Sequence, residues 1–139
     1  MRKVNNVIQI FCPIRKSWFV NTPEEWVRQH CIKYLNQFYH FPLQNMVAEF
    51  PVLINQFQQR VDILIYNKSN PWILCECKKP DVKLNQEVLN QAMRYAQILQ
   101  TPYIYLTNGI EHIFTSIDYE NKKVDKIESL PFYEVTSSR

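Results

Sequence analysis

The chain has 139 residues, of which 46% are hydrophobic and 14% aromatic, and it contains only one glycine. This supplies one compact core and falls short of the usual size of two, so we expect a single ordered domain over residues 1–139. No window reaches the roughly 18 apolar residues of a membrane span, and the basic start is not followed by a signal-peptide pattern. The sequence therefore predicts a soluble, cytoplasmic protein without a membrane partner.

The four cysteines, Cys12, Cys31, Cys75 and Cys77, are predicted to be buried free thiols. Cys75 and Cys77 alternate along one predicted strand, too close on one face to form an ordinary disulfide. A zinc site would need pairs such as Cys-x-x-Cys, and Cys75-Glu76-Cys77 lacks that spacing. We therefore set zinc aside.

A helix is predicted from Thr22 to about Tyr39. Thr22 suits the N-cap, Pro23 suits the first helical position, and Glu25 is placed to complete a capping box. Apolar side chains then recur every three or four residues, at Val27, Cys31, Tyr34, Leu35 and Phe38. One apolar stripe of this helix should pack against a sheet.

Three strands are predicted next, as an antiparallel meander. Residues 46–54 and 58–66 are separated by a polar break at Asn55-Gln56, and residues 72–77 follow a turn at 67–71. Pro51 favours an edge position or a bulge for the first of these strands.

A second helix over residues 85–100 and two further strands, at 103–107 and 113–119, complete the predicted elements. Asn108-Gly109 between the last two strands is a strong signal for a two-residue hairpin. The predicted order is α-β-β-β-α-β-β, an α/β (α+β) fold. Its core spans about residues 22–118, with an N-terminal arm at 1–21 and a polar tail at about 132–139.

Two acids are predicted to meet across the second hairpin. If its turn is centred on Ser69, Tyr66 lies opposite Trp72 and Asp62 lies opposite Glu76. Opposed side chains have Cβ atoms about 4.5–5.5 Å apart, and like charges there are destabilising unless a cation offsets them. Because carboxylates, water and substrate phosphate are common ligands of Mg²⁺, the pair predicts a divalent-cation site.

Lys78 should return to the face of Glu76, because side chains alternate along a strand. In a site that cleaves phosphodiesters, a metal lowers the pKa of water, and a nearby ammonium orients the water or stabilises developing charge. The alternative is that Lys78 forms only an ordinary salt bridge with the two acids on an exposed face. The apolar residues around the acids argue against that alternative, because they predict strands buried on both faces.

Asp62 on one strand, followed by Glu76-Cys77-Lys78 on the next, resembles the PD-(D/E)xK nuclease superfamily. Five segments further resemble the N-terminal nuclease-like domain of type I restriction enzyme R subunits: TPEEWVRQ at 22–29, QRVDI at 59–63, ECKKP at 76–80, QAMRY at 91–95 and TNG at 107–109. This likeness covers about residues 22–118. Val61 stands where the superfamily is named for a proline.

The resemblance implies a restriction-endonuclease-like core, a mixed sheet flanked by helices, in an endonuclease of a restriction system. It would cut DNA with Mg²⁺, for which Mn²⁺ would substitute. Asp62 and Glu76 would be metal ligands, and Lys78 would assist the hydrolytic water. A motor or specificity subunit is an implied partner, and a homodimer would supply two sites for double-strand cleavage.

Further site residues are expected around this centre. Gln91 and Tyr95 resemble a Gln-x-x-x-Tyr motif and share a helix face, where Gln91 could reach phosphate or water and Tyr95 is either a nucleic-acid contact or core. Glu25 is expected either as an additional metal ligand or only as the capping-box acid. Expected phosphate contacts are Arg60, Lys79 and Lys83. A basic cluster alone is more often a solvated turn, and the net charge of +3 decides nothing.

Three classes of function follow. The leading expectation is a metal-dependent endonuclease that hydrolyses DNA. The alternative is a catalytically inactive module of the same fold that binds nucleic acid or a protein partner. A purely structural or assembly protein is the third class and would not respond to divalent metal.

Overall fold

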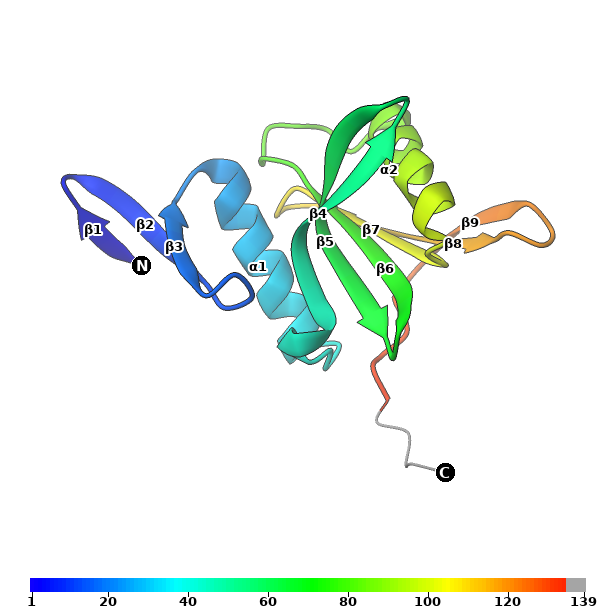
Figure 1. The fold of residues 1–139 in the computed structure, drawn as a ribbon, viewed down its shortest axis with the longest axis horizontal. Helices are drawn as coiled ribbons and strands as arrows, with labels where there is room; N and C mark the ends of the chain where they lie inside the picture. The colour runs from blue at the N-terminus through cyan, green and yellow to red at the C-terminus, as the bar shows by residue number, and fades with distance from the viewer. Residues whose placement is uncertain (135–139) are drawn as a thin grey trace.

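Two separate sheets and two helices make up the fold (Figure 1). The computed structural model describes residues 1–134. The smaller sheet consists of β1 (Arg2–Val4), β2 (Val7–Cys12) and β3 (Ser17–Val20). The larger sheet consists of β4 (Met46–Ile54), β5 (Phe57–Asn67), β6 (Asn70–Cys77), β7 (Tyr103–Thr107), β8 (His112–Asp118) and β9 (Lys123–Ile127). The helices are α1 (Pro23–Gln37) and α2 (Gln86–Leu99), and a 3₁₀ turn, η1 (Leu43–Asn45), precedes β4.

The larger sheet is mixed, and its strands follow one another in chain order. Only β6 and β7 run parallel, and α2 makes the crossover that a parallel pair requires. The two helices contribute to different hydrophobic clusters, so α1 and α2 cover opposite faces of this sheet. The predicted α/β class, with a mixed sheet flanked by helices, is confirmed.

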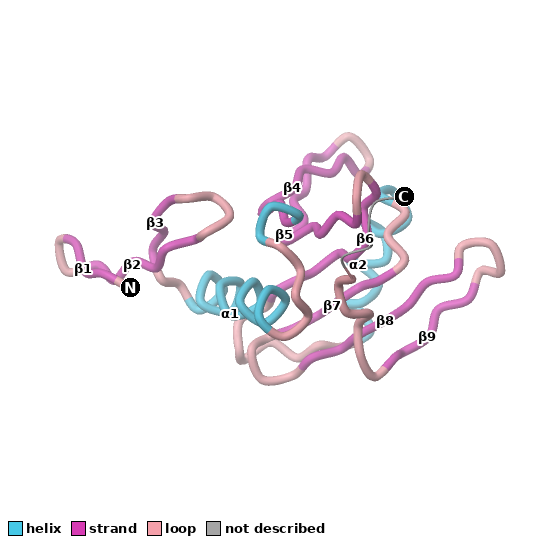
Figure 2. The backbone as a smooth tube through the Cα atoms, turned by 90° about the horizontal axis from the view of Figure 1, so that it is seen from below, coloured by secondary structure: helices cyan, strands magenta, loops and turns pink. Residues whose placement is uncertain are grey.

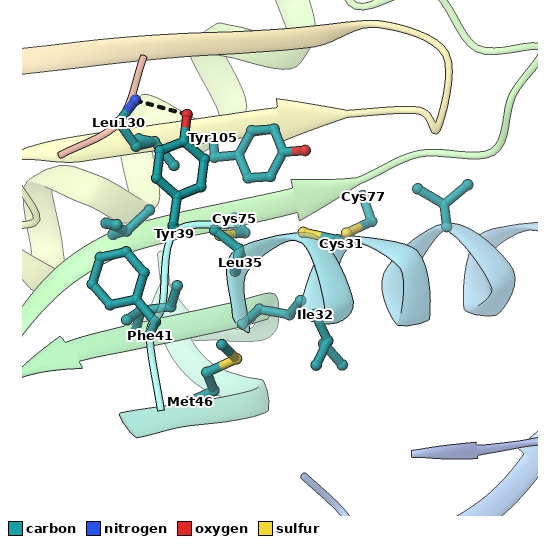
Figure 3. Close-up of a cluster of buried hydrophobic side chains, with 14 of the residues drawn as sticks. Cys31, Ile32, Leu35, Tyr39, Phe41, Met46, Cys75, Cys77, Tyr105 and Leu130 are labelled. Atoms are coloured by element: carbon teal, nitrogen blue, oxygen red, sulfur yellow. Dashed lines mark hydrogen bonds between the residues drawn. The ribbon is translucent and has the colours of Figure 1, made fainter. Parts of the chain in front are cut away.

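Side chains of α1 and the residues just after it form the larger hydrophobic cluster (Figure 3). Its fully buried members include Ile32, Leu35, Tyr39, Phe41, Ile63, Ile65, Ile73, Cys75 and Tyr105. Each large side chain buried in this way stabilises the fold by about 1.5–3 kcal/mol. Val27, Cys31, Tyr34 and Leu35 of the predicted stripe therefore form the packing face of this helix, whereas Phe38 follows its last residue and is 50% exposed.

The second helix matches its prediction closely. Its N-cap is Asn85, whose side-chain oxygen accepts a hydrogen bond of 3.1 Å from the Val88 backbone N–H. It ends at Gln100, which adopts a left-handed conformation with φ of 58°. Ala92, Tyr95 and Ala96 face the sheet, where they pack with Leu64, Leu74, Ile104 and Leu106.

The start of α1 was only half predicted. Thr22 is the N-cap and accepts a hydrogen bond of 3.1 Å from the Glu25 backbone N–H, and Pro23 is the first helical residue. The capping box is wrong, because the Glu25 carboxylate binds Arg15, Arg28 and Gln29. The Thr22 backbone N–H, which a capping box would bind to Glu25, donates instead to the Val20 carbonyl. The helix ends at Gln37, two residues before the predicted end.

The predicted N-terminal arm is in fact the small sheet, which stands beside α1 on the side away from the large sheet (Figures 1 and 2). Its β1–β2 turn uses Asn5 and Asn6, both with positive φ. β9 was also missed, and with β8 it forms a hairpin that extends away from the body of the protein (Figure 2). Both missed regions are largely exposed, and β2, although mostly apolar, does not alternate apolar with polar residues as a half-buried strand does.

The connection between the last two strands of the prediction is longer than the two-residue hairpin expected there. The β7–β8 connection spans four residues, because Thr107 pairs with His112 across the loop. Its loop is closed by Asn108, whose side-chain oxygen accepts hydrogen bonds from the backbone N–H groups of residues 110 and 111. β4 is an edge strand, as Pro51 indicated.

The first residues of the polar tail predicted at about 132–139 pack against the rest of the protein. The rings of Tyr39 and Phe132 lie 4.8 Å apart, and the Tyr133 backbone N–H donates to the Tyr39 carbonyl at 2.9 Å. Figure 3 shows Leu130 against Tyr39, whose hydroxyl accepts from the Leu130 N–H. Residues 135–139 of the predicted tail lie outside the described residues. Neither helix of the described chain is long and apolar enough to cross a membrane.

Candidate active site

Asp62 on β5 and Glu76 on β6 are neighbours across the antiparallel pair. Ile63 pairs with Cys75, and the next step along each strand brings the two acids together. The Cys77 backbone N–H donates to Asp62 Oδ2 at 2.8 Å, which fixes the carboxylate at this position. The predicted meeting of the two acids is therefore present in the structure.

The predicted register nearer the turn is wrong. Tyr66 pairs with Pro71 and not with Trp72, because the turn occupies Lys68 and Ser69 with Asn67 opposite Asn70. A β-bulge between Ile65 and Tyr66 then shifts the pairing by one residue. Beyond the bulge, from Ile65 toward Asp62, the strands therefore pair in the register that the prediction assumed for the whole hairpin.

The two carboxyl groups have opposite pKa shifts. Glu76 is only 6% exposed, and burial, followed by the hydrogen bond and charge of Asp62, raises its pKa well above the usual range. Burial also acts to raise the pKa of Asp62, but hydrogen bonds from Glu76, Arg28 and the Cys77 N–H outweigh it and lower that pKa. Between the two carboxyl groups, a proton is therefore held more readily by Glu76 than by Asp62. A divalent cation would suit these oxygens, since it offsets the repulsion that raises the pKa of Glu76.

Lys78 follows the end of β6, where its backbone N–H donates to the Thr107 carbonyl at 2.9 Å. Its charge acts to lower the pKa of Glu76, against the effect of burial, so the ammonium lies near that acid. Within residues 1–134, the ion pair of Asp62 is made by Arg28, and no salt bridge involves Lys78. The structure therefore does not contain the ordinary salt bridge that was the alternative for Lys78.

Glu25 lies in a network of polar side chains between the two sheets. Its carboxylate accepts from Arg15, from Arg28 Nη1 at 2.7 Å and from Gln29 Nε2 at 2.9 Å. Arg28 also donates to Asp62 Oδ1 at 2.9 Å, so one guanidinium joins Glu25 to the candidate site. The direct metal contact predicted for Glu25 remains a prediction.

Gln91 and Tyr95 lie on α2 and touch each other, with Gln91 Nε2 donating to the Tyr95 hydroxyl at 3.2 Å. Tyr95 is 3% exposed and belongs to the core cluster beneath α2. Burial, followed by the charge of Glu76, raises the pKa of Tyr95, so its hydroxyl is within electrostatic reach of the acids. The core alternative for Tyr95 is therefore present in the structure, and its contact with nucleic acid remains a prediction.

The basic residues predicted to contact phosphate are exposed. Lys83 lines a cleft of about 390 Å³ at the start of α2, together with Gln91 and Arg94. Lys79 lies on the same loop, which Asn108 ties to the β7–β8 turn through a hydrogen bond of 2.9 Å to the Val82 carbonyl. Arg60 lies on β5, where Glu49 is 4.0 Å away.

All four cysteines are free and buried, as predicted. Cys31 of α1 packs against Cys75 and Cys77 of β6 within the cluster of Figure 3. In the part of the chain that the structure describes, no group of three histidine, cysteine, aspartate or glutamate residues is arranged to hold a metal ion.

The sequence analysis missed Arg15, Arg28 and Glu49 at this site. Arg28 stands three residues after Glu25, a spacing that indicates an ion pair on one helix face. It also interrupts the buried stripe of α1 with a charge, and buried charges are rarely unpaired. Its contact with Asp62 joins residues 34 positions apart, and no spacing rule reveals that.

The family described as Type I restriction enzyme R protein N terminus (HSDR_N) matches residues 23–131. The matched span contains both helices, the larger sheet and every site residue predicted from the sequence, whereas β1–β3 and Arg15 precede it. No curated protein gives a significant match. The chain therefore belongs to the family of type I restriction enzyme R protein N-terminal domains and is a nuclease-like module of a restriction system.

Proposed function

We propose that the chain is a metal-dependent endonuclease that hydrolyses DNA phosphodiester bonds, with Mg²⁺ held by Asp62 and Glu76 and Mn²⁺ able to replace it. The observation that carries the proposal is the poorly exposed pair of acids on the neighbouring strands β5 and β6, with a lysine beside it. Such a pair is costly for stability alone, because two like charges are brought out of water next to each other.

Each residue has a distinct part in this proposal. Asp62 is oriented by the Cys77 N–H and Arg28, which leaves further lone pairs on both oxygens for a ligand. Glu76 would lose its proton when a cation binds. Lys78 would orient the attacking water or stabilise charge on the phosphate, and Gln91 would contact phosphate or water from α2. When bound, the divalent ion would supply Lewis-acid chemistry at the phosphate and lower the pKa of water.

DNA would approach over the loop between β6 and α2, with Lys79, Lys83, Arg60 and the Tyr95 hydroxyl as expected contacts. As part of a restriction system, the module would act with a motor or specificity subunit in the cytoplasm. A homodimer would place two such sites on one duplex.

The first test is Mn²⁺ binding by calorimetry in the wild-type chain and in Asp62→Asn. We expect saturable binding in the wild type that falls at least about ten-fold in the variant, because the variant loses one anionic ligand. Asp125→Asn on the exposed strand β9 is the matched control and should bind like the wild type.

The second test is cleavage of duplex DNA by Lys78→Ala, which should keep metal binding and lose activity. Undiminished cleavage by that variant would contradict the role of Lys78. DNA binding without any metal uptake, even with an oligonucleotide present, would favour the catalytically inactive module instead.

A further inference from the structure

The charge of the chain is unevenly distributed along the sequence. Four of its 16 lysines and arginines lie in residues 1–21, whereas all of its 13 aspartates and glutamates follow that segment. Residues 22–139 therefore hold 12 cations against 13 acids and are slightly negative as a whole. The net positive charge of the protein belongs to the segment of the small sheet, which precedes the family match.

The small sheet has one packed face and one exposed face. Cys12 and Phe19 lie on the packed face, in the hydrophobic cluster beside α1. Because side chains alternate along a strand and paired residues point to the same side, Phe11 and Trp18 lie on the opposite face. The same alternation places four polar or aromatic residues and three valines there, and no acid; the four are Arg2, Gln9, Phe11 and Trp18.

Arg2 is held in place on this exposed face without losing its charge. Its Nε–H donates to Gln9 Oε1 at 2.7 Å, and its Cζ lies 4.3 Å from the centre of the Trp18 ring. Neither partner is negatively charged, and Arg2 makes no salt bridge within residues 1–134. The terminal nitrogens of the guanidinium are thus available to an anion, and their planar fork suits two phosphate oxygens.

Two lysines add to the positive charge of this sheet. Lys3 is next to Arg2 on β1, Lys16 lies in the β2–β3 connection, and both are exposed. In the described part of the chain neither makes a salt bridge, whereas Arg15 is bound by Glu25 and Glu49. Cations without acidic neighbours attract a polyanion over about 10 Å at moderate salt, and the slightly negative remainder of the protein lacks this attraction.

We propose that the exposed face of the small sheet binds the backbone of duplex DNA, with Arg2 on a phosphate and Trp18 as the ring that positions Arg2. This inference deepens the proposed function and rests on it for the choice of DNA as the polyanion. Strands of a sheet can lie along DNA, where apolar side chains contact thymine methyl groups. Because the small sheet stands on the far side of α1 from the large sheet (Figure 1), it would hold duplex outside the cleavage site.

The test measures the affinity of the full chain for a fluorescein-labelled duplex of about 30 base pairs by fluorescence anisotropy. EDTA is present throughout, so that no divalent cation contributes. In Arg2→Gln we expect binding about ten-fold weaker at low salt, the lower end for loss of a hydrogen bond between charged groups. The slope of log Kd against log salt concentration should fall by about one, because one fewer phosphate is neutralised.

Two further variants separate a specific contact from overall charge. Lys126→Gln removes the same charge from the exposed strand β9, at the opposite end of the protein (Figure 2), and is the matched control. Its affinity should change by less than about two-fold, because salt screens a distant charge. Trp18→Leu keeps every charge but removes the ring over Arg2, and it should also weaken binding.

Circular dichroism checks the fold of each variant. If Arg2→Gln does not fold, the double variant Lys3→Gln/Lys16→Gln should reduce both affinity and salt slope. Unchanged affinity and salt slope in a folded Arg2→Gln would overturn the inference and leave the proposed function standing. Equally tight, Arg2-dependent binding of poly-L-glutamate would also overturn it, since the face would then suit an acidic protein. Arg2-dependent DNA binding in a chain that takes up no Mn²⁺ would support the inference and contradict the proposed cation site alone.

Discussion

The two sheets of this protein depend on different kinds of stabilisation. In the larger sheet, Ile63, Leu64, Ile73 and Leu74 have no exposed surface, because α1 covers one face and α2 the other. In the smaller sheet, Ile8 and Val20 are 51% and 53% exposed. Burial therefore stabilises the first sheet, whereas the second depends on surface contacts such as the edge-to-face pair of Phe11 and Trp18.

The two sheets also differ in how they relate to the candidate site. The buried sheet fixes the strands that carry Asp62 and Glu76, and it is the part that the family match covers. The exposed sheet precedes that match, yet Arg15 in its β2–β3 connection reaches Glu25. The small sheet region thus reaches the candidate site through Arg15, and it adds Cys12 and Phe19 to the hydrophobic cluster beside α1.

The largest effect on stability is expected inside the large core. Leu35→Ala removes a side chain with no exposed surface from the cluster between α1 and the sheet. We expect a loss of about 2–5 kcal/mol in the free energy of unfolding, because apolar contact is lost and a cavity remains. Urea denaturation followed by circular dichroism measures it, and a loss below about 1 kcal/mol would mean that this core is loosely packed.

An intermediate effect is expected at the junction between the two regions. Thr22→Ala removes the N-cap of α1, directly after β3. We expect a loss of about 0.5–2 kcal/mol in the same measurement, since the Glu25 backbone N–H loses its acceptor. Thr22→Ser keeps the hydroxyl and should retain most of the stability, which separates capping from packing.

The smallest effect is expected on the exposed sheet. Ile8→Ser changes a side chain that is half exposed on β2, so the free energy of unfolding should change by no more than about 0.5 kcal/mol. A loss as large as that of Leu35→Ala would show that the two sheets unfold as one equally packed unit. The stated difference in packing between the two sheets would then be wrong.

The parts of the fold that the sequence predicted are the parts with strong periodicity. The bounds of β4 and β7 were predicted to the residue, and those of α2 within one residue at each end. The apolar positions of β7 and α2 face a core, whereas in β4 only Met46 and Val52 are buried. β1–β3 and β9 were missed because half-exposed strands do not separate apolar from polar positions clearly. The β5–β6 bulge was missed because no residue type specifies it.

The candidate site likewise contains residues that the sequence predicted and contacts that it did not. Asp62, Glu76 and Lys78 could be placed from strand alternation, and the structure brings the two acids together. The contacts of Arg28 could not be predicted, because a long side chain from a helix can reach any of several strands. Glu25 was misread as a capping acid for the same reason: its true partners are set by the packing of α1 between the sheets.

The single glycine of the chain, Gly109, has φ of +88°, and a Cβ atom there would lie 3.3 Å from both Trp26 Cζ3 and Val27 Cγ2. The β7–β8 turn and the first turn of α1 are therefore in contact at a point where even one methyl group would need space. The helix that meets this turn is the one that carries Arg28 to Asp62. A Cβ atom at position 109 would therefore require the side chain of Trp26 or Val27 to shift by a few tenths of an ångström, on the same helix that positions Arg28.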